Sequence, residues 1–130
     1  MDEFLSSRAL SASGMKAQAN RLRYVSENIA NADTPGYRRK IAPFEQVLEN
    51  GRPSGAVQTG RVELDQTEVE RIYDPSHPMA DDTGHYDGTN VDLVIEIADA
   101  REAQRSYEAN LKMFDQSRQM SRSLLELLRR

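Results

Sequence analysis

Apolar residues near the start of the chain recur at the spacing of a helix. Leu5, Ala12 and Ala19 form one row at intervals of seven, and Met15, Leu22 and Ile29 form the next, with Val25 beside them. Such a stripe is typical of an amphipathic helix that packs along one side. We therefore expect a helix over residues 1–33, with these seven residues as a narrow, alanine-rich seam for assembly.

The helical pattern stops at Thr34-Pro35-Gly36-Tyr37. Proline disfavours helical backbone at the residue before it, and Pro-Gly suits the two central positions of a type II turn. Asn28 and Asn31 lie just before this turn, where their side chains can bond the free carbonyls of this helix end or of a partner's helix. Of these two roles, the local one is the one we expect.

The last segment predicts a second, longer helix over residues 89–130, because it contains neither glycine nor proline. Asn90 suits the N-cap, with Asp92 in the first turn. Polar side chains interrupt its apolar face at Gln104, Arg118 and Ser121. The predicted assembly seam of this helix comprises Leu93, Ile97, Ala100, Tyr107, Asn110, Leu111, Phe114, Leu125 and Leu128.

The length of this second helix sets the shape of the molecule. A helix of about 40 residues is roughly 60 Å long, whereas a compact domain of this size is only about 36 Å across. The molecule must therefore be elongated. Its longer helix carries apolar residues on more than one face, so we expect other chains to complete the core. We also expect the terminal helices of an isolated chain to be frayed and to fold on assembly.

The middle of the chain, residues 34–88, reads as an irregular insert. It holds all five prolines and six of the seven glycines. Extended runs at 57–64 and 69–73 predict a β-hairpin, with Asp65-Gln66 as its turn. Asn50-Gly51 marks another turn, and residues 74–88 look like a loop. The expected fold is thus mainly α, with long terminal helices forming a coiled-coil-like domain around a small β-hairpin and loop insert.

Composition excludes several classes of protein. The 130 residues carry a net charge of −4, which argues against nucleic acid as the main partner. Cysteine is absent, which excludes disulfides and thiolate chemistry. No apolar window approaches a membrane span, and acids stand near the amino terminus where a secretory signal has bases. The net charge lies in the insert, since residues 35–90 hold six bases and ten acids.

Candidate chemistry is sparse, and we expect no enzyme, no cofactor, no metal and no small-molecule substrate. Asp74, His77, Asp81, Asp82 and His85 are suitable metal ligands, but their spacing matches no known site, and turns use the same residues. The basic run Arg38-Arg39-Lys40 could touch phosphate or acidic lipid, yet a solvated or interface-facing run is the interpretation we favour. Neither a nucleophile elbow nor a phosphate-binding loop is present.

Two motifs resemble those of bacterial flagellar rod and hook proteins. The stretch from Ser26 to Tyr37, SENIANADTPGY, is similar to the amino-terminal signature of that family, whose turn motif maps to Asn28, Asn31, Thr34, Pro35, Gly36 and Tyr37. EAQRSYEAN at residues 102–110 is similar to the carboxy-terminal motif. YDPSHP at 73–78 resembles a loop of one proximal-rod branch, whereas Gly88-Thr89-Asn90-Val91 resembles a sister proximal-rod subunit.

The resemblance implies a non-enzymatic subunit of the rod, the drive shaft of the flagellar basal body. It implies export without a cleavable signal peptide through the flagellar type III apparatus, and assembly in the periplasmic space near the MS ring. The implied partners are the chain itself, other rod proteins and the export apparatus. A soluble coiled-coil adaptor or chaperone, which shares the helix pattern, is the alternative.

Overall fold

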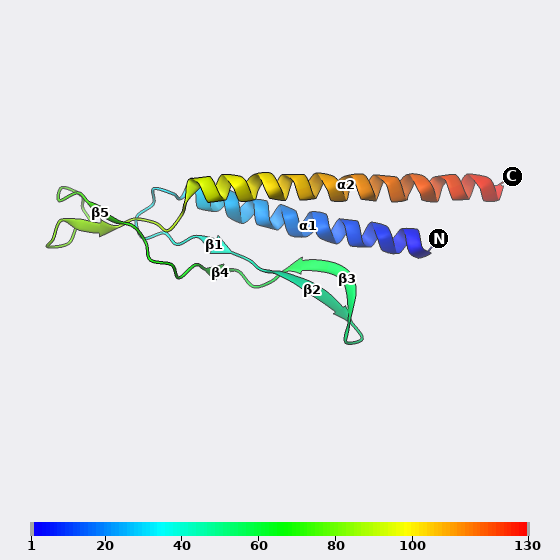
Figure 1. The fold of residues 1–130 in the computed structure, drawn as a ribbon, viewed down its shortest axis with the longest axis horizontal. Coiled ribbons are helices and arrows are strands. Elements are labelled where there is room, and N and C mark those ends of the chain that lie inside the picture. Colours follow the sequence, from blue (N-terminus) through cyan, green and yellow to red (C-terminus); the bar gives the residue numbers. More distant parts are fainter. Residues whose placement is uncertain (1, 130) are drawn as a thin grey trace.

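The protein is an elongated pair of helices with a thin β insert, as the computed structural model shows (Figure 1). The structure describes residues 2–129, with side chains from Leu5 onward. Helices α1 (Asp2–Ala30) and α2 (Leu93–Arg129) run antiparallel, so both termini lie at one end. With 37 residues, α2 is about 55 Å long. The predicted mainly α fold and elongated shape are confirmed.

The turn after α1 has the predicted conformation. Gly36 has a φ of 77°, and the N–H of Tyr37 donates to the carbonyl of Thr34 at 3.1 Å, as in a type II turn. The Gly36 N–H points the other way, toward the carbonyls of residues 87 and 88, each at 3.0 Å. The turn therefore ties the end of α1 to the segment that leads into α2.

Helix α2 begins with a different cap from the one expected. The carbonyl of Asp92 accepts from the N–H four residues on, and its carboxylate accepts from the N–H two residues on, each at 3.0 Å. Asp92 is thus the N-cap. The prediction of Asn90 is wrong because its amide is engaged elsewhere: it accepts from the Arg39 N–H at 2.7 Å and donates to the Asp65 carbonyl at 2.9 Å.

The insert contains three antiparallel two-stranded sheets. Strand β1 (Lys40–Ile41) pairs with β4 (Glu63–Leu64), β2 (Phe44–Glu49) with β3 (Arg52–Thr59), and β5 (Arg71–Tyr73) with β6 (His85–Asp87). The first two pairs form one long, interrupted hairpin, broken where the Gly60 N–H donates to the Pro43 carbonyl at 2.7 Å. The third pair forms a separate tip at the end of the molecule opposite the termini (Figure 1).

The strand pairing differs from the sequence prediction. The expected hairpin between 57–64 and 69–73 is wrong, because β3 pairs back with β2 across Asn50-Gly51. These two residues have φ values of 53° and 78°, as a two-residue type I′ turn requires. Asp65 instead starts a local turn by accepting from the Thr67 N–H at 2.8 Å. The expected loop 74–88 contains strand β6.

The two helices meet through small and polar side chains. Three facing pairs define the contact row: Ser7 with Ser117, Gly14 with Asn110, and Asn28 with Glu96. Each step of seven along α1 is matched by a step of seven back along α2. Ala17, Val25 and Ala103 are the buried apolar residues among those described. The helix pair by itself therefore buries little apolar surface.

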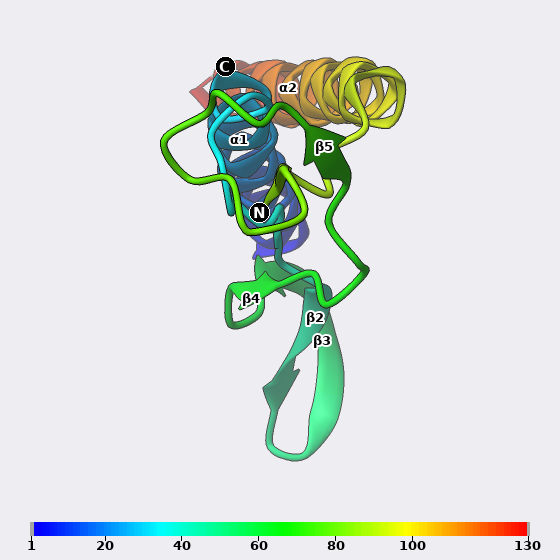
Figure 2. The ribbon, with the colours of Figure 1, turned by 90° about the vertical axis from the view of Figure 1, so that its left-hand side faces the viewer.

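The insert packs against α1. The Val57 N–H donates to the Ser13 hydroxyl at 3.2 Å, and the Asn20 amide donates to the Thr59 hydroxyl at 3.0 Å. The end-on view shows α2 and the β2–β3 hairpin on different sides of α1 (Figure 2). Within the described part of the chain, neither helix has an apolar stretch that would reach across a bilayer.

Candidate functional site

Asn28 joins the end of α1 to the start of the insert. Its side-chain oxygen accepts from the Tyr37 hydroxyl and from the Lys40 N–H, both at 2.8 Å. Its amide donates to the Lys40 carbonyl at 3.0 Å. The side chain is buried, so these bonds satisfy a polar group that would be costly to leave unpaired. Asn28 therefore bonds β1 rather than the carbonyls at its own helix end.

Asn31 has the local role that the sequence predicts. Its amide donates to the Glu27 carbonyl in the last turn of α1 at 2.8 Å, and its side-chain oxygen accepts from the Thr34 hydroxyl at 3.1 Å. The helix end and the proline turn are thus held by one side chain. Together with Asn28, it fixes the direction in which the chain leaves α1.

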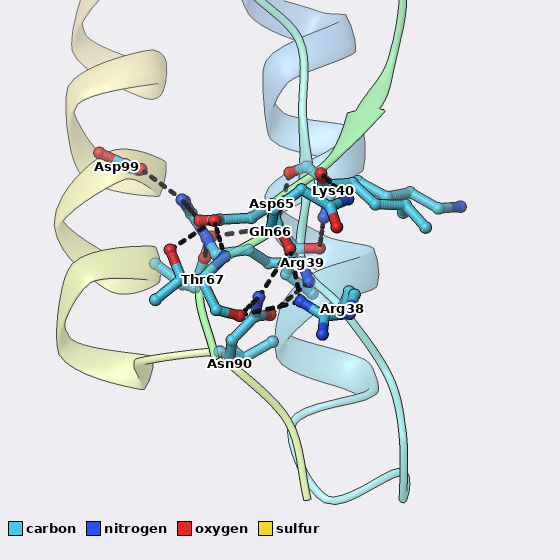
Figure 3. A network of polar contacts seen from close by, with 12 residues as sticks. Arg38, Arg39, Lys40, Asp65, Gln66, Thr67, Asn90 and Asp99 are labelled. Atoms are coloured by element: carbon cyan, nitrogen blue, oxygen red, sulfur yellow. Dashed lines mark hydrogen bonds and ion pairs between the residues drawn. The ribbon is translucent and has the colours of Figure 1, made fainter. Parts of the chain in front are cut away.

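A buried ion pair lies at the centre of the junction between α1, α2 and the insert (Figure 3). Glu96 is 0% exposed, and its carboxylate accepts from Arg39 Nε at 2.6 Å. The Arg39 guanidinium also contacts Asp65 at 3.3 Å and Asp99 at 3.7 Å. The short hydrogen-bonded geometry offsets the cost of burying the charge. We call these four residues the polar junction.

The basic run is engaged within the chain. Arg38 donates to the carbonyls of Asp65 and Thr67, at 3.2 and 2.9 Å (Figure 3). Lys40 Nζ lies 2.7 Å from a Glu27 carboxylate oxygen. All three basic side chains therefore bond other residues of the chain in and around the junction. The sequence interpretations, a phosphate or lipid contact and a solvated or interface-facing run, did not include this role.

The charges at the junction shift their neighbours' pKa values. The Arg39 pKa is raised: burial alone would lower it, but the hydrogen bond and charge of Glu96 outweigh that effect. The Asp65 pKa is lowered, first by the hydrogen bond from the Thr67 hydroxyl and further by Arg39. The hydrogen bond to Glu27 raises the Lys40 pKa. Arg39, Lys40 and Asp65 are therefore charged at neutral pH.

The Asp/His loop is a hairpin end whose side chains bond one another. The Asp74 carboxylate accepts from the Ser76 hydroxyl at 2.7 Å, and the Asp81 carboxylate accepts from Thr83 and from Arg71, both at 2.6 Å. The His77 ring stacks on Tyr86 with centroids 3.9 Å apart. Among the side chains that the structure describes, from Leu5 onward, no three potential ligands converge to hold a metal ion.

Asn110 lies on the contact row, whereas most of the other predicted seam residues lie beside it. Met15 and Ile29 directly follow the contact-row residues of α1, and Ile97 and Leu111 directly follow those of α2. Leu22 and Leu125 continue these two apolar rows at the same spacing of seven or fourteen residues. One residue along a helix turns a side chain by about 100°. Because the helices are antiparallel, both turns bring the apolar rows to the same side of the pair, opposite the insert.

Much of this apolar face is open. The exposed seam residues are Leu5, Ala12, Ala19, Ile29, Leu93, Ile97, Tyr107, Leu111, Leu125 and Leu128. Met15, Leu22, Ala100, Asn110 and Phe114 are half-buried, and Val25 is buried. The structure thus separates two rows, one closing the helix pair and one left open. Sequence reasoning missed Glu96, although one acid within an apolar run of α2 was a usable signal.

Comparison with known proteins matches both ends of the chain to flagellar families. Residues 10–38 match the family described as flagella basal body rod protein, and residues 83–127 match the carboxy-terminal family of flagellar basal body rod FlgEFG proteins. The flagellar basal-body rod protein FlgC of Agrobacterium fabrum is 40% identical, with 99% of this chain and 98% of the relative covered. The chain belongs to the FlgC family of flagellar basal-body rod proteins.

Other FlgC relatives cover similar shares of the chain. The proteins of Aquifex aeolicus and Salmonella typhimurium are 36% and 32% identical, and the alignments cover 85% and 91% of this chain. As a FlgC family member, the chain is a structural subunit of the proximal rod in the flagellar basal body, and it is not an enzyme. The amino-terminal match includes Asn28, Asn31 and the proline turn.

Proposed function

We propose that this chain polymerises with itself and with other rod proteins into the helical tube that transmits torque through the proximal rod. The observation that carries this proposal is the open apolar face. Exposed leucine and isoleucine rows from both helices lie on one side of the pair, while the insert occupies the other. A contiguous apolar face of this kind is typical of a surface that another protein covers.

The two halves of the molecule then have different places in the tube. The helical segments, residues 1–33 and 89–130, form an inner, coiled-coil-like domain whose seams are the apolar rows. The insert, residues 34–88, packs outside between neighbouring subunits. The polar junction supports this division, since it fixes the insert to the helix pair through Glu96 and Arg39.

Export as an unfolded chain fits the way the subunit is held together. We propose passage through the flagellar type III apparatus into the periplasmic space, followed by assembly near the MS ring. The helix pair buries few apolar side chains, so little hydrophobic stabilisation opposes its unfolding. The chain also lacks cysteine, so no disulfide has to be broken before export.

The test is whether the chain enters intact basal bodies. A tagged copy is expressed in a flagellated host that lacks its own FlgC, and basal bodies are purified and probed for the tag. Co-purification together with restored swimming supports the proposal. A discrete soluble dimer by sedimentation, with none of the chain in basal bodies, would instead favour the adaptor or chaperone alternative.

A further inference from the structure

The end of the β2–β3 hairpin projects away from the helix pair (Figure 2). Its turn residues, Asn50 and Gly51, are both exposed. A hollow of about 450 Å³ lies beside the turn and is lined by residues 49, 50 and 52–54, so water reaches the Asn50 side chain. Within the part of the chain that the structure describes, this side-chain amide forms no hydrogen bond. Asn50 is therefore free to react with its own backbone.

An asparagine that precedes a glycine loses its side-chain amide without an enzyme. The nitrogen of Gly51 attacks the side-chain carbonyl carbon of Asn50, and because glycine has no Cβ, nothing on that residue hinders the approach. A new C–N bond forms, the bond to the side-chain nitrogen breaks, and ammonia leaves with the proton of the Gly51 N–H. Water then opens the five-membered succinimide at either carbonyl, giving aspartate or isoaspartate. One water is consumed for each ammonia released, and nothing is oxidised or reduced.

The hairpin holds this turn weakly. Ring closure needs the backbone of Asn50 to leave the left-handed conformation of the type I′ turn, so the turn has to open first. Two register pairs, 48 with 53 and 49 with 52, separate the turn from the irregularity between residues 46 and 48. The Ser54 hydroxyl adds a bond to the Val47 carbonyl at 2.8 Å. Pro53 has no N–H to donate, and a two-stranded ribbon is marginal by itself, so the hairpin end opens at little cost.

We propose that the folded subunit converts Asn50 spontaneously to aspartate and isoaspartate, and that the other asparagines stay intact. Each of the five others precedes a residue that has a side chain, which hinders attack by its nitrogen. Three of them, Asn20, Asn28 and Asn110, also lie in helices, where the backbone is held. The inference goes beyond the proposed function and does not rest on it.

Asp87-Gly88 offers an internal comparison, because an aspartate that precedes glycine forms the same succinimide by losing water. At this position both reacting groups are held. The Gly88 N–H donates to the Glu70 carbonyl, and the Asp87 carboxylate accepts from Arg71, both at 2.7 Å. We therefore expect no isoaspartate at residue 87 under conditions that modify Asn50.

The two products differ in their effect on the hairpin. Aspartate before glycine also suits a type I′ turn, so aspartate at position 50 keeps the strand register and adds one negative charge. Isoaspartate carries the main chain through its side-chain carbon, which lengthens the turn by one backbone atom. The pairing of 48 with 53 and of 49 with 52 then no longer fits a two-residue turn. Since neither product returns to asparagine, modified subunits accumulate with age.

Mass spectrometry of the tryptic peptide 41–61, in which Asn50 is the one asparagine, tests the proposal. The full chain is incubated in mildly alkaline buffer, either native or unfolded in urea, and then digested. Residue 50 should gain about 1 Da, as an amide becomes an acid, and electron-transfer fragmentation should show both products. The native rate should be within about tenfold of the unfolded rate. Reaction of the unfolded chain alone, or equal reaction at other asparagines, would overturn the proposal.

Two variants test the separate steps. Leu48→Cys/Pro53→Cys places two cysteines opposite each other in a chain that has no others. With this disulfide formed, Asn50 should react at least about tenfold more slowly than in the same variant reduced, because the hairpin end no longer opens. In urea, where the hairpin plays no part, Gly51→Ala should slow the reaction by hindering attack. Equal rates in either comparison would overturn the corresponding step, and with it the proposed route.

Discussion

Gly14 lies so close to Asn110 that a Cβ at position 14 would be 2.7 Å from the Asn110 side-chain oxygen. The amide cannot swing away freely, because its nitrogen donates to the Ser106 carbonyl at 2.9 Å. Glycine inside a helix costs about 1 kcal/mol relative to alanine. This glycine is therefore explained by the close approach of the two helices.

The first prediction concerns this pair. Gly14→Ala should lower the free energy of unfolding by roughly 1–3 kcal/mol, because overpacking outweighs the gain in helix propensity. In the Asn110→Ala background, the same change should instead stabilise by about 1 kcal/mol. Urea unfolding followed by circular dichroism measures both. Equal effects of Gly14→Ala in the two backgrounds would show that positions 14 and 110 are not energetically coupled.

The polar junction predicts that replacing Arg39 lowers the free energy of unfolding more than replacing Glu96 does. Arg39→Met should cost about 3–5 kcal/mol, because it leaves the carboxylate of Glu96 buried without its ionic partner. Glu96→Gln should cost less, because Arg39 keeps Asp65 and Asp99. The double variant Arg39→Met/Glu96→Met should recover much of the loss. The same unfolding experiment decides, and a larger loss from Glu96→Gln than from Arg39→Met would contradict it.

Acid should weaken the β5–β6 tip. Hydrogen bonds from Thr83 and Arg71 hold the pKa of Asp81 well below its ordinary value of 3.8. A carboxylate whose pKa is lower in the folded than in the unfolded state stabilises the fold at pH values above its unfolded-state pKa. This contribution is lost as the pH falls through the folded-state pKa. Asp81→Asn should therefore melt lower than wild type at pH 7, with the difference narrowing below about pH 4. Melting curves from pH 2 to 7 test this, and a constant difference would refute it.

The open apolar face predicts an assembly defect without a folding defect. Leu111 is 41% exposed in the subunit, so Leu111→Asp should leave the chain folded and expressed. It should nevertheless block incorporation into the rod and abolish swimming, because burying an unpaired carboxylate at a seam is costly. Phe114→Asp should behave similarly. Lys112→Asp, one residue away and also exposed, is the matched control, and normal motility of the Leu111 variant would count against the seam.

Hydrogen exchange should detect the dependence of the helices on assembly. In dilute monomer, amides at the start of α1 and the end of α2 should exchange rapidly, because few apolar contacts protect them. The same amides should exchange slowly in isolated basal bodies. Mass spectrometry of the two samples makes the comparison. Strong protection at both ends of the dilute chain would contradict the expectation that the termini fold on assembly.

The sequence predicted those parts of the fold that depend on residues close together in the chain. Unbroken helical periodicity and the proline turn fixed both helices and the bend after α1. The strand pairing was missed because two turn signals competed, and only the Asn50-Gly51 turn brings a partner strand into register. The prediction of an N-cap at Asn90 was wrong because Arg39, 51 positions earlier in the chain, occupies its side chain.

The contact between the helices was harder to predict for a different reason. Hydrophobic periodicity locates the most apolar row of a helix, and here that row lies one residue away from the row that closes the pair. Small and polar residues such as Gly14 and Ser117 carry no hydrophobic signal. Their role becomes visible only when both helices are placed side by side.

The seven-residue repeat of facing pairs also has a mechanical consequence. The three facing pairs lie about 10 and 20 Å apart along the axis, and these contacts resist sliding of one helix past the other. Two helices that cannot slide past each other bend as one unit, and this unit is stiffest against bending in the plane that contains both helix axes. In a tube built from such subunits, part of the rigidity would therefore depend on how each helix pair is oriented around the central channel.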